Sequence, residues 1–164
     1  MRIAIGCDEA AFNLKSIIMD HLKNKGIEVD DFGAAKGEVI LYPDVAYRVA
    51  DQIAAGKYER AILLCGTGIG MSICANKVPG VRAAVCHDPF SAERSRKSND
   101  AQIMCLGERV VGPELAKYLV DVWIGCDFSG GGSAPKVKRI NELEQEHIRA
   151  VNMYCSRQPQ PPAV

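Results

Sequence analysis

The sequence has no net charge, because 20 basic residues are balanced by 20 acidic residues among its 164 residues. Nucleic acids and acidic membrane surfaces attract an excess of basic residues, so neither kind of partner is expected. The chain also has no apolar stretch of membrane-spanning length and no apolar signal region near its start. We predict one cytoplasmic domain with a normal core, since chains of this length bury roughly two-thirds of their unfolded surface.

The residues that usually bind metals are arranged in no typical pattern. The seven cysteines include no CxxC pair, and the sequence has three histidines, so the usual ligand set of a zinc site is missing. Without a secretory signal, the cysteines indicate free thiols in a reducing compartment rather than disulfides. We therefore expect no metal at the functional site.

Apolar runs alternate with helical patterns along most of the chain. Short apolar runs that suit buried strands occur at residues 2–6, 27–32, 60–65, 81–86 and 102–106. Helical patterns lie between and after them, at residues 12–22, 43–55, 71–77, 91–98 and 113–124. This alternation predicts an α/β fold, a three-layer Rossmann-like parallel sheet with helices on both faces.

The C-terminal part has a different character. A glycine-rich segment at residues 129–133 precedes a charged helical pattern from residue 135 to about residue 152, which indicates a helical arm that leaves the body. The last eight residues contain much proline and few apolar side chains. We predict a single domain over residues 1–152 and a disordered tail over residues 153–164.

The sequence CGTGIG at residues 65–70 is the strongest local signal. It follows a predicted buried strand and precedes a helical segment, so that backbone N–H groups can turn toward a negatively charged ligand. No GKS or GKT follows, and the spacing does not fit the dinucleotide fingerprint. A tight turn that binds no ligand is the alternative interpretation.

The ends of parallel strands meet at one edge of a sheet, where ligands of such folds bind. Cys65 ends a strand beside backbone donors that favour the thiolate, so it could act as a base, or it could be a small core residue. Asp8 could bind a hydroxyl group of a ligand, cap the following helix, or do both. Arg109 and Lys136 offer charge for a phosphate, although such residues often lie on the solvated surface.

Seven short motifs, in order, resemble the ribose-5-phosphate isomerase B and galactose-6-phosphate isomerase family over residues 1 to about 145. They are GCD (6–8), DFG (31–33), YPD (42–44), CGTGIG (65–70), ANKVPGVRAAV (75–85), SND (98–100) and GERVVG (107–112). The resemblance implies an aldose–ketose isomerase of a phosphorylated sugar that works through an enediolate without metal or cofactor. It also implies a homodimer or a tetramer, with active sites shared between subunits.

The resemblance further implies a role for each matched residue. Cys65 is then the base that moves a proton between adjacent carbons, and Thr67 assists proton transfer at the oxygens. The pocket for the enediolate oxygen is formed by the backbone of Gly66, Gly68, Ile69 and Gly70. The substrate-binding residues are Asp8, Glu9, Tyr42, Asn99, Arg109 and Lys136. Asn99 and Arg109 are expected to come from the neighbouring subunit.

The chain departs from the family pattern at three places. Glu9 stands where relatives that act on ribose 5-phosphate typically carry a histidine, and Ser98 stands where their HND segment carries another. Gly132 and Lys136 stand where the family has phosphate-binding arginines. Glu9 would repel a phosphate, so it is expected either to turn away and pair with Lys136 or Arg139, or to face a substrate that binds differently.

The lost histidines favour a substrate that needs no ring opening. Ribose 5-phosphate is mainly a closed furanose, whose opening suits an imidazole, whereas a tetrose 4-phosphate cannot form that ring. We therefore predict that a tetrulose 4-phosphate, such as erythrulose 4-phosphate, is the preferred substrate. The alternatives are isomerisation of ribose 5-phosphate, with His87 or water opening the ring, and a non-catalytic sugar-phosphate-binding protein. His87 could equally be a structural hydrogen-bonding residue.

Overall fold

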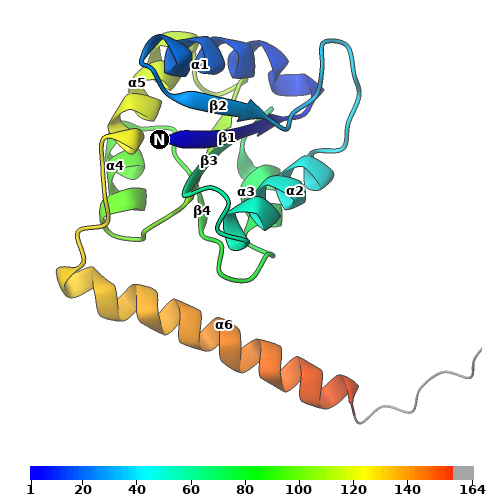
Figure 1. Ribbon diagram of the computed structural model, residues 1–164, viewed down its shortest axis with the longest axis vertical. Helices are drawn as coiled ribbons and strands as arrows, with labels where there is room; N and C mark the ends of the chain where they lie inside the picture. Colours follow the sequence, from blue (N-terminus) through cyan, green and yellow to red (C-terminus); the bar gives the residue numbers. More distant parts are fainter. Residues whose placement is uncertain (157–164) are drawn as a thin grey trace, which may run out of the picture.

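The strands of the computed structural model, which describes residues 1–156, form one sheet (Figure 1). They are β1 (Arg2–Cys7), β2 (Glu28–Asp31), β3 (Arg60–Cys65), β4 (Ala83–Val85) and β5 (Ile103–Gly107). All neighbouring pairs are parallel, in the order β2-β1-β3-β5-β4. The predicted α/β fold with a parallel sheet is therefore confirmed.

Helices cover both faces of the sheet. One face carries α1 (Phe12–Asn24), α4 (Pro89–Lys97) and α5 (Pro113–Ile124), and the other carries α2 (Tyr42–Ala54) and α3 (Ile69–Ala75). Strand β3 is covered on both faces, which explains why its sequence is apolar without interruption. Ile62 and Leu64 pack toward the first set of helices, whereas Leu63 and Cys65 pack toward the second.

The direction in which successive strands are added to the sheet reverses between β1 and β3. From β1 the chain passes through α1 to β2 at one side of the sheet, whereas after β3 it continues to β4 and β5 at the other side. Ligands of open α/β sheets bind outside the carboxyl ends of the strands at such a point. In this fold that place lies between Asp8, which follows β1, and Cys65, which ends β3.

The edge strand β4 is shorter than the apolar run at residues 81–86 predicts. The backbone N–H of Val81 donates to the Val78 carbonyl within a turn, at 3.2 Å, and β4 pairs only with β5. The strand therefore has a partner over three residues only.

The body also contains two short 3-10 helices, η1 (Glu9–Ala11) and η2 (Gly131–Ser133).

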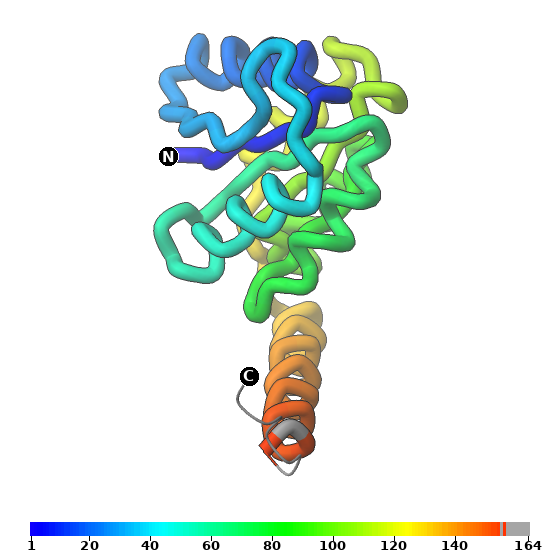
Figure 2. The backbone as a smooth tube through the Cα atoms, turned by 90° about the vertical axis from the view of Figure 1, so that its right-hand side faces the viewer, coloured from blue at the N-terminus to red at the C-terminus, as the bar shows by residue number. Residues whose placement is uncertain are grey.

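The predicted helical arm is the helix α6 (Ala134–Cys155), which extends away from the body (Figures 1 and 2). It ends three residues later than expected, so residues 153–155 belong to the helix, whereas residues 157–164 lie outside the described part. Asn141 and Glu144 connect it to the body by accepting hydrogen bonds from Arg82 Nη1 and from the Gly80 N–H. Neither α6 nor any other helix up to residue 156 is long and apolar enough to cross a membrane.

Candidate active site

The Cys65 thiol lies at the carboxyl end of β3, where 6% of the residue is exposed. Its Sγ accepts a hydrogen bond from the backbone N–H of Gly68 at 3.1 Å. Gly68 adopts the left-handed conformation, with φ of +75°, which turns the chain back over the sulfur. A backbone donor aimed at this sulfur can stabilise negative charge on it, as a general base requires.

A pocket of about 580 Å³ opens beside this thiol. The residues that line it come from four places along the chain, and they are Asp8, Ala10, Tyr42, Cys65, Gly66, Thr67, Ile69, Gly70, Ile73 and Arg109. Most of the residues singled out by the sequence are therefore brought together. Ala10 and Ile73 were missed, although Ile73 follows Ile69 by one helical turn and so lies on the same side of α3.

Tyr42, the first residue of α2, packs against the glycine-rich segment. A Cβ atom at Gly70 would lie 2.6 Å from Tyr42 Cε2 and 2.7 Å from Cζ, so a larger residue would displace the ring. The absence of a side chain at Gly70 therefore allows the tyrosine to approach the backbone beside Cys65. This close packing places the phenol at the pocket, where it can donate a hydrogen bond to a ligand oxygen.

Asp8 caps the following helix, one of the roles that the sequence left open, and it also lies at the pocket. One carboxylate oxygen accepts a hydrogen bond from the Ala10 N–H at 3.1 Å, which caps η1, and the residue also lines the pocket. Burial raises the pKa of this carboxyl group, and the nearby Glu9 raises it further, whereas Arg109 lowers it. Asp8 is thus a buried acceptor held in a fixed orientation beside the thiol.

Arg109 belongs to the pocket of its own chain, which corrects the expectation that it would reach in from a neighbouring subunit. Strand β5 lies directly beside β3, so the turn after β5 runs next to the glycine-rich segment. The Arg109 N–H donates to the Gly66 carbonyl at 3.1 Å, and its guanidinium lies close above Gly66. The sequence did not reveal this contact because it does not show which strands are neighbours.

Glu9 is exposed and turns away from the pocket. Its Oε2 accepts a hydrogen bond from the Ile40 N–H at 3.4 Å, in the loop before α2. It forms no ion pair with Lys136 or Arg139 of the same chain, and Arg139 instead pairs with Glu142 and Glu146 within α6. Glu9 is therefore close to the site through its neighbour Asp8, but it does not line the pocket.

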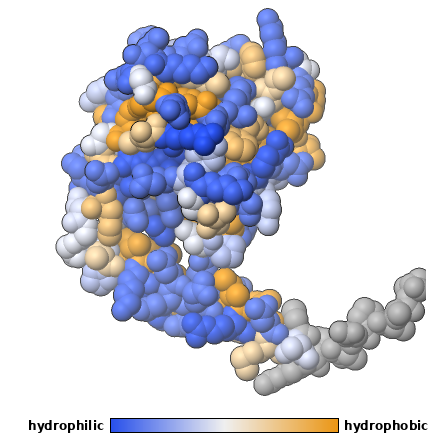
Figure 3. All heavy atoms as spheres, in the orientation of Figure 1, coloured by the Kyte–Doolittle hydropathy of each residue, from blue (hydrophilic) through white to orange (hydrophobic). Residues whose placement is uncertain are grey.

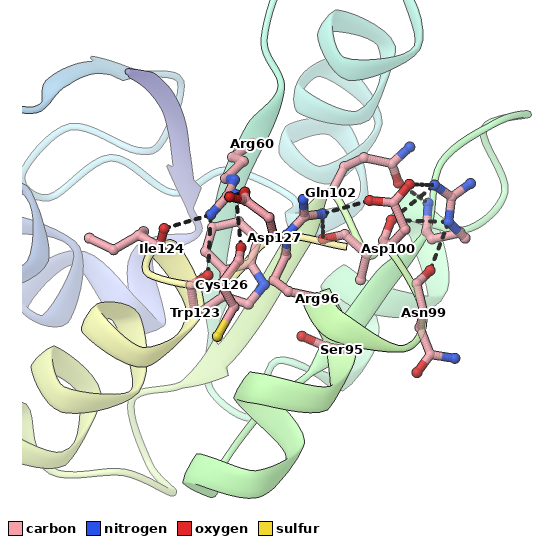
Figure 4. Close-up of polar contacts among 12 residues, drawn as sticks. Arg60, Ser95, Arg96, Asn99, Asp100, Gln102, Trp123, Ile124, Cys126 and Asp127 are labelled. Carbon is pink, nitrogen blue, oxygen red and sulfur yellow. Dashed lines mark hydrogen bonds and ion pairs between the residues drawn. The ribbon is translucent and has the colours of Figure 1, made fainter. Parts of the chain in front are cut away.

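Asn99 lies beyond the amino ends of the strands, whereas Cys65 lies at a carboxyl end. Its carbonyl accepts a hydrogen bond from Arg82 Nε at 3.0 Å, and Arg82 immediately precedes β4. The side chain of Asn99 is exposed and points away from Arg60, which binds Asp127, and from the buried Arg96 (Figure 4).

Lys136 is exposed near the start of α6, a helix whose Asn141 contacts the same Arg82. The amino and carboxyl ends of the central strands are separated by about 17 Å, which is five steps of roughly 3.3 Å. Within one chain, Asn99 and Lys136 therefore do not join the residues around Cys65.

The three histidines are all engaged or distant from the pocket. His87 Nε2 accepts a hydrogen bond from the Gly107 N–H at 3.0 Å, which supports the interpretation of this residue as a structural hydrogen-bonding residue. Burial lowers the pKa of His87, in keeping with a neutral ring that accepts this bond. His21 pairs with Asp121 at 2.7 Å, and His147 lies exposed on α6.

Ser98 directly follows α4 as its C-cap, and its hydroxyl accepts a hydrogen bond from Arg94. The position at which the resemblance led us to expect a histidine is therefore occupied by a residue that bonds to the last turn of α4. Over residues 1–156, no group of three or more histidine, cysteine, aspartate or glutamate side chains is arranged to hold a metal ion.

Comparison with known proteins gives consistent matches over most of the chain. The sequence model of the ribose/galactose isomerase family matches residues 3–140. D-erythrulose-4-phosphate isomerase of Pectobacterium atrosepticum is 56% identical over 147 residues, which cover 89% of this chain and 97% of that protein. Ribose-5-P isomerase B of Listeria innocua is 52% identical, covering 90% of this chain and 99% of its own length.

The fold has matches among solved structures as well. Ribose-5-phosphate isomerase B of Clostridium thermocellum superimposes with a TM-score of 0.87 at 49% sequence identity. The superposition covers 90% of this chain and 99% of that one.

Proposed function

The chain belongs to the ribose/galactose isomerase family and is an aldose–ketose isomerase of a phosphorylated sugar, and from this premise we propose that it prefers a tetrulose 4-phosphate. The observation that carries the proposal is a pocket with a buried thiol but, among the described residues of the same chain, no available imidazole. Cys65 lines it with Asp8, Tyr42 and Arg109, whereas His87 is bonded to Gly107.

The reaction needs one base and one site that stabilises an oxyanion. The Cys65 thiolate removes a proton from the carbon next to the substrate carbonyl, and the C–H electron pair forms the C=C bond of an enediolate. The backbone of residues 66–70 accommodates the developing negative oxygen. Thr67 moves a proton between the two oxygens, and the thiol returns its proton to the former carbonyl carbon.

The remaining polar groups bind the substrate. Asp8 accepts a hydrogen bond from a substrate hydroxyl group, and Tyr42 donates one to a substrate oxygen. Arg109 binds the phosphate, because a guanidinium presents several N–H donors to an anion. Glu9 faces the Ile40 backbone, so its charge need not meet the phosphate directly.

An open-chain substrate explains why the missing histidine can be tolerated. Ring opening needs an acid–base group near the ring oxygen, and neither Ser98 nor His87 has one to offer, since each is bonded elsewhere. A tetrulose 4-phosphate has no hydroxyl that can close a five-membered ring on its C2 carbonyl, and in the corresponding tetrose the phosphate blocks the C4 hydroxyl, so the substrate reaches the site open. The name of the Pectobacterium atrosepticum relative, D-erythrulose-4-phosphate isomerase, supports this choice.

The protein acts as a homodimer, or as a tetramer of two such dimers, in which Asn99 and Lys136 of each subunit complete the partner's site. Their place near the amino ends of the strands supports this assembly, because they are too far from Cys65 of their own chain. Ile69 and Ile73 at the pocket are 54% and 59% exposed, an apolar surface that a partner would cover. Hydrophobic side chains are also exposed along α6 and on the body (Figure 3).

We place the enzyme in the cytoplasm. The cysteines whose state the structure describes, at positions 7, 65, 74, 86, 105 and 126, are unpaired thiols. Such thiols are typical of a reducing compartment.

The substrate is tested by comparing kcat/KM for erythrulose 4-phosphate and ribose 5-phosphate in the wild type, Ser98→His and Ser98→Ala. We expect the wild type to favour the tetrulose by about tenfold or more, and Ser98→His to gain activity on ribose 5-phosphate. Ser98→Ala controls for loss of the hydroxyl bonded to Arg94 and should show no such gain. A wild type that favours ribose 5-phosphate would refute the proposed substrate.

A further inference from the structure

The turn at residues 107–111 carries Arg109 and is fixed to β3 by its own backbone. The Glu108 N–H donates to the Cys65 carbonyl at 3.0 Å, and the Arg109 N–H donates to the Gly66 carbonyl at 3.1 Å. A Cβ atom at Gly107 would lie 2.6 Å from Thr67 Cα, so the turn and the segment after Cys65 are in close contact. Any shift of the turn would therefore move residues on both sides of the pocket.

On the side of β4, a side chain replaces the missing strand. The last backbone bond between the two segments joins the Cys86 N–H to the Cys105 carbonyl at 3.1 Å, just beyond the end of β4 at Val85. The next N–H of β5 that faces the β4 side belongs to Gly107, and it donates to His87 Nε2 at 3.0 Å. The imidazole thus supplies the acceptor that a longer β4 would have provided.

On the side of α1, a second side chain spans a gap. A pocket of about 300 Å³ separates the turn from α1, and Leu14, Glu108 and Arg109 are among its lining residues. Across this region Glu108 Oε2 accepts a hydrogen bond from the Leu14 N–H at 3.0 Å. The bond satisfies a donor in the first turn of α1, which has no partner within its own helix.

We propose that His87 and Glu108 are positioning residues for substrate binding, which hold the turn at residues 107–111 so that Arg109 faces the substrate phosphate and Thr67 keeps its place. This inference rests on the proposed role of Arg109. Neither residue lines the pocket beside Cys65, so each acts through the turn and not by touching the substrate.

The His87 bond requires a neutral ring. Nε2 can accept from the Gly107 N–H only without a proton of its own, since protonation makes both imidazole nitrogens donors. The charged side chains on the adjoining segments are Asp88 at the start of α4 and Glu108 and Arg109 in the turn. Burial lowers the pKa of His87 more than Asp88 raises it, so the ring stays neutral at neutral pH and is protonated only in acid.

The positioning role is tested with paired variants at each residue. His87→Leu and Glu108→Ala remove the acceptor, whereas His87→Gln and Glu108→Gln keep one at a similar reach. Because an unsatisfied donor weakens the turn, we expect the first pair to raise KM about tenfold and to lower kcat less. The second pair should recover most of this loss.

A pH profile and amide exchange add readouts that a general loss of stability would not give. In the wild type, KM should rise in acid as His87 is protonated, and His87→Gln should remove that rise. The Gly107 amide should exchange with solvent deuterium faster in His87→Leu. His21→Leu is the matched control, because it removes a bonded histidine from the His21–Asp121 pair without changing KM.

The kinetic arms use whichever sugar phosphate the wild type converts fastest, so they do not depend on the tetrulose being correct. An unchanged KM in both His87→Leu and Glu108→Ala would overturn the proposal. Unchanged protection of the Gly107 amide in His87→Leu would also overturn it. A preference for ribose 5-phosphate would refute the proposed substrate only.

Discussion

Replacing Cys65 by alanine should abolish turnover with little damage to the fold. The substitution removes one small buried sulfur, for which the loss of packing is about 0.5–1.5 kcal/mol. It also leaves the Gly68 N–H without its acceptor, at a cost of about 1 kcal/mol. With a shift of about 2–4 °C per kcal/mol for a chain of this size, Tm should fall by roughly 3–10 °C.

Activity should fall far more than stability. A positioned general base contributes about 10²- to 10⁴-fold to a rate, and Cys65 is the proposed base of both proton transfers, so kcat should drop by about 10³-fold or more. The assays are product formation and incorporation of solvent deuterium at the carbon beside the carbonyl, which would also separate an enzyme from a protein that only binds the sugar. Both signals should be lost together.

Cys126→Ala is the matched control for this experiment. Cys126 is 8% exposed, close to the 6% of Cys65. It lies beyond α5, where its carbonyl accepts a hydrogen bond from Arg60 at the amino end of β3, away from the pocket. We expect a comparable change in Tm and turnover within about twofold of the wild type. If Cys65→Ala keeps a tenth of the wild-type turnover, Cys65 is not the base; if Cys126→Ala loses as much, the effect is not specific to the site.

Three further predictions concern the rest of the pocket. Mixing inactive Cys65→Ala and Asn99→Ala chains under conditions of subunit exchange should restore activity at about a quarter of the sites, and none will return if the sites are not shared. Gly70→Ala should lower kcat/KM about tenfold by displacing the Tyr42 ring, and should cost much less in a Tyr42→Ala background; equal losses in both backgrounds would exclude the clash. Asp8→Asn should lose activity but unfold at higher urea concentration at pH 7. Because the pKa of Asp8 is raised in the folded state, its charge lowers stability as the pH rises through that pKa, so the gain should shrink toward about pH 4; a gain that does not change with pH would contradict this cause.

The strands at the centre of the sheet could be predicted from sequence because burial on both faces leaves a simple pattern. The run RAILLC corresponds to β3 residue for residue, since every one of its side chains is buried. The same reasoning placed Asp8 and Cys65 at one edge, and the structure brings them to one pocket. Strand β4 was predicted too long, because an apolar run does not show where its pairing partner ends.

The order of the strands accounts for what the sequence could not show. No local pattern indicates that β5 inserts between β3 and β4, and this neighbour relation puts Arg109 beside Gly66. The bonds of His87 to Gly107 and of Glu108 to Leu14 depend on the same arrangement. Contacts across about 20 and 94 positions of sequence are set by topology, and periodicity carries no information about them.

The two edges of the sheet have a consequence for behaviour at high protein concentration. An exposed edge strand offers unpaired backbone groups to another copy of the chain and can start aggregation. Strand β2 carries Glu28, Asp30 and Asp31 among its four residues, so two such edges would repel each other, and β4 offers only three residues. Crowded solutions of this protein should therefore resist growth of the sheet from molecule to molecule, and any self-association should proceed through helical and pocket surfaces instead.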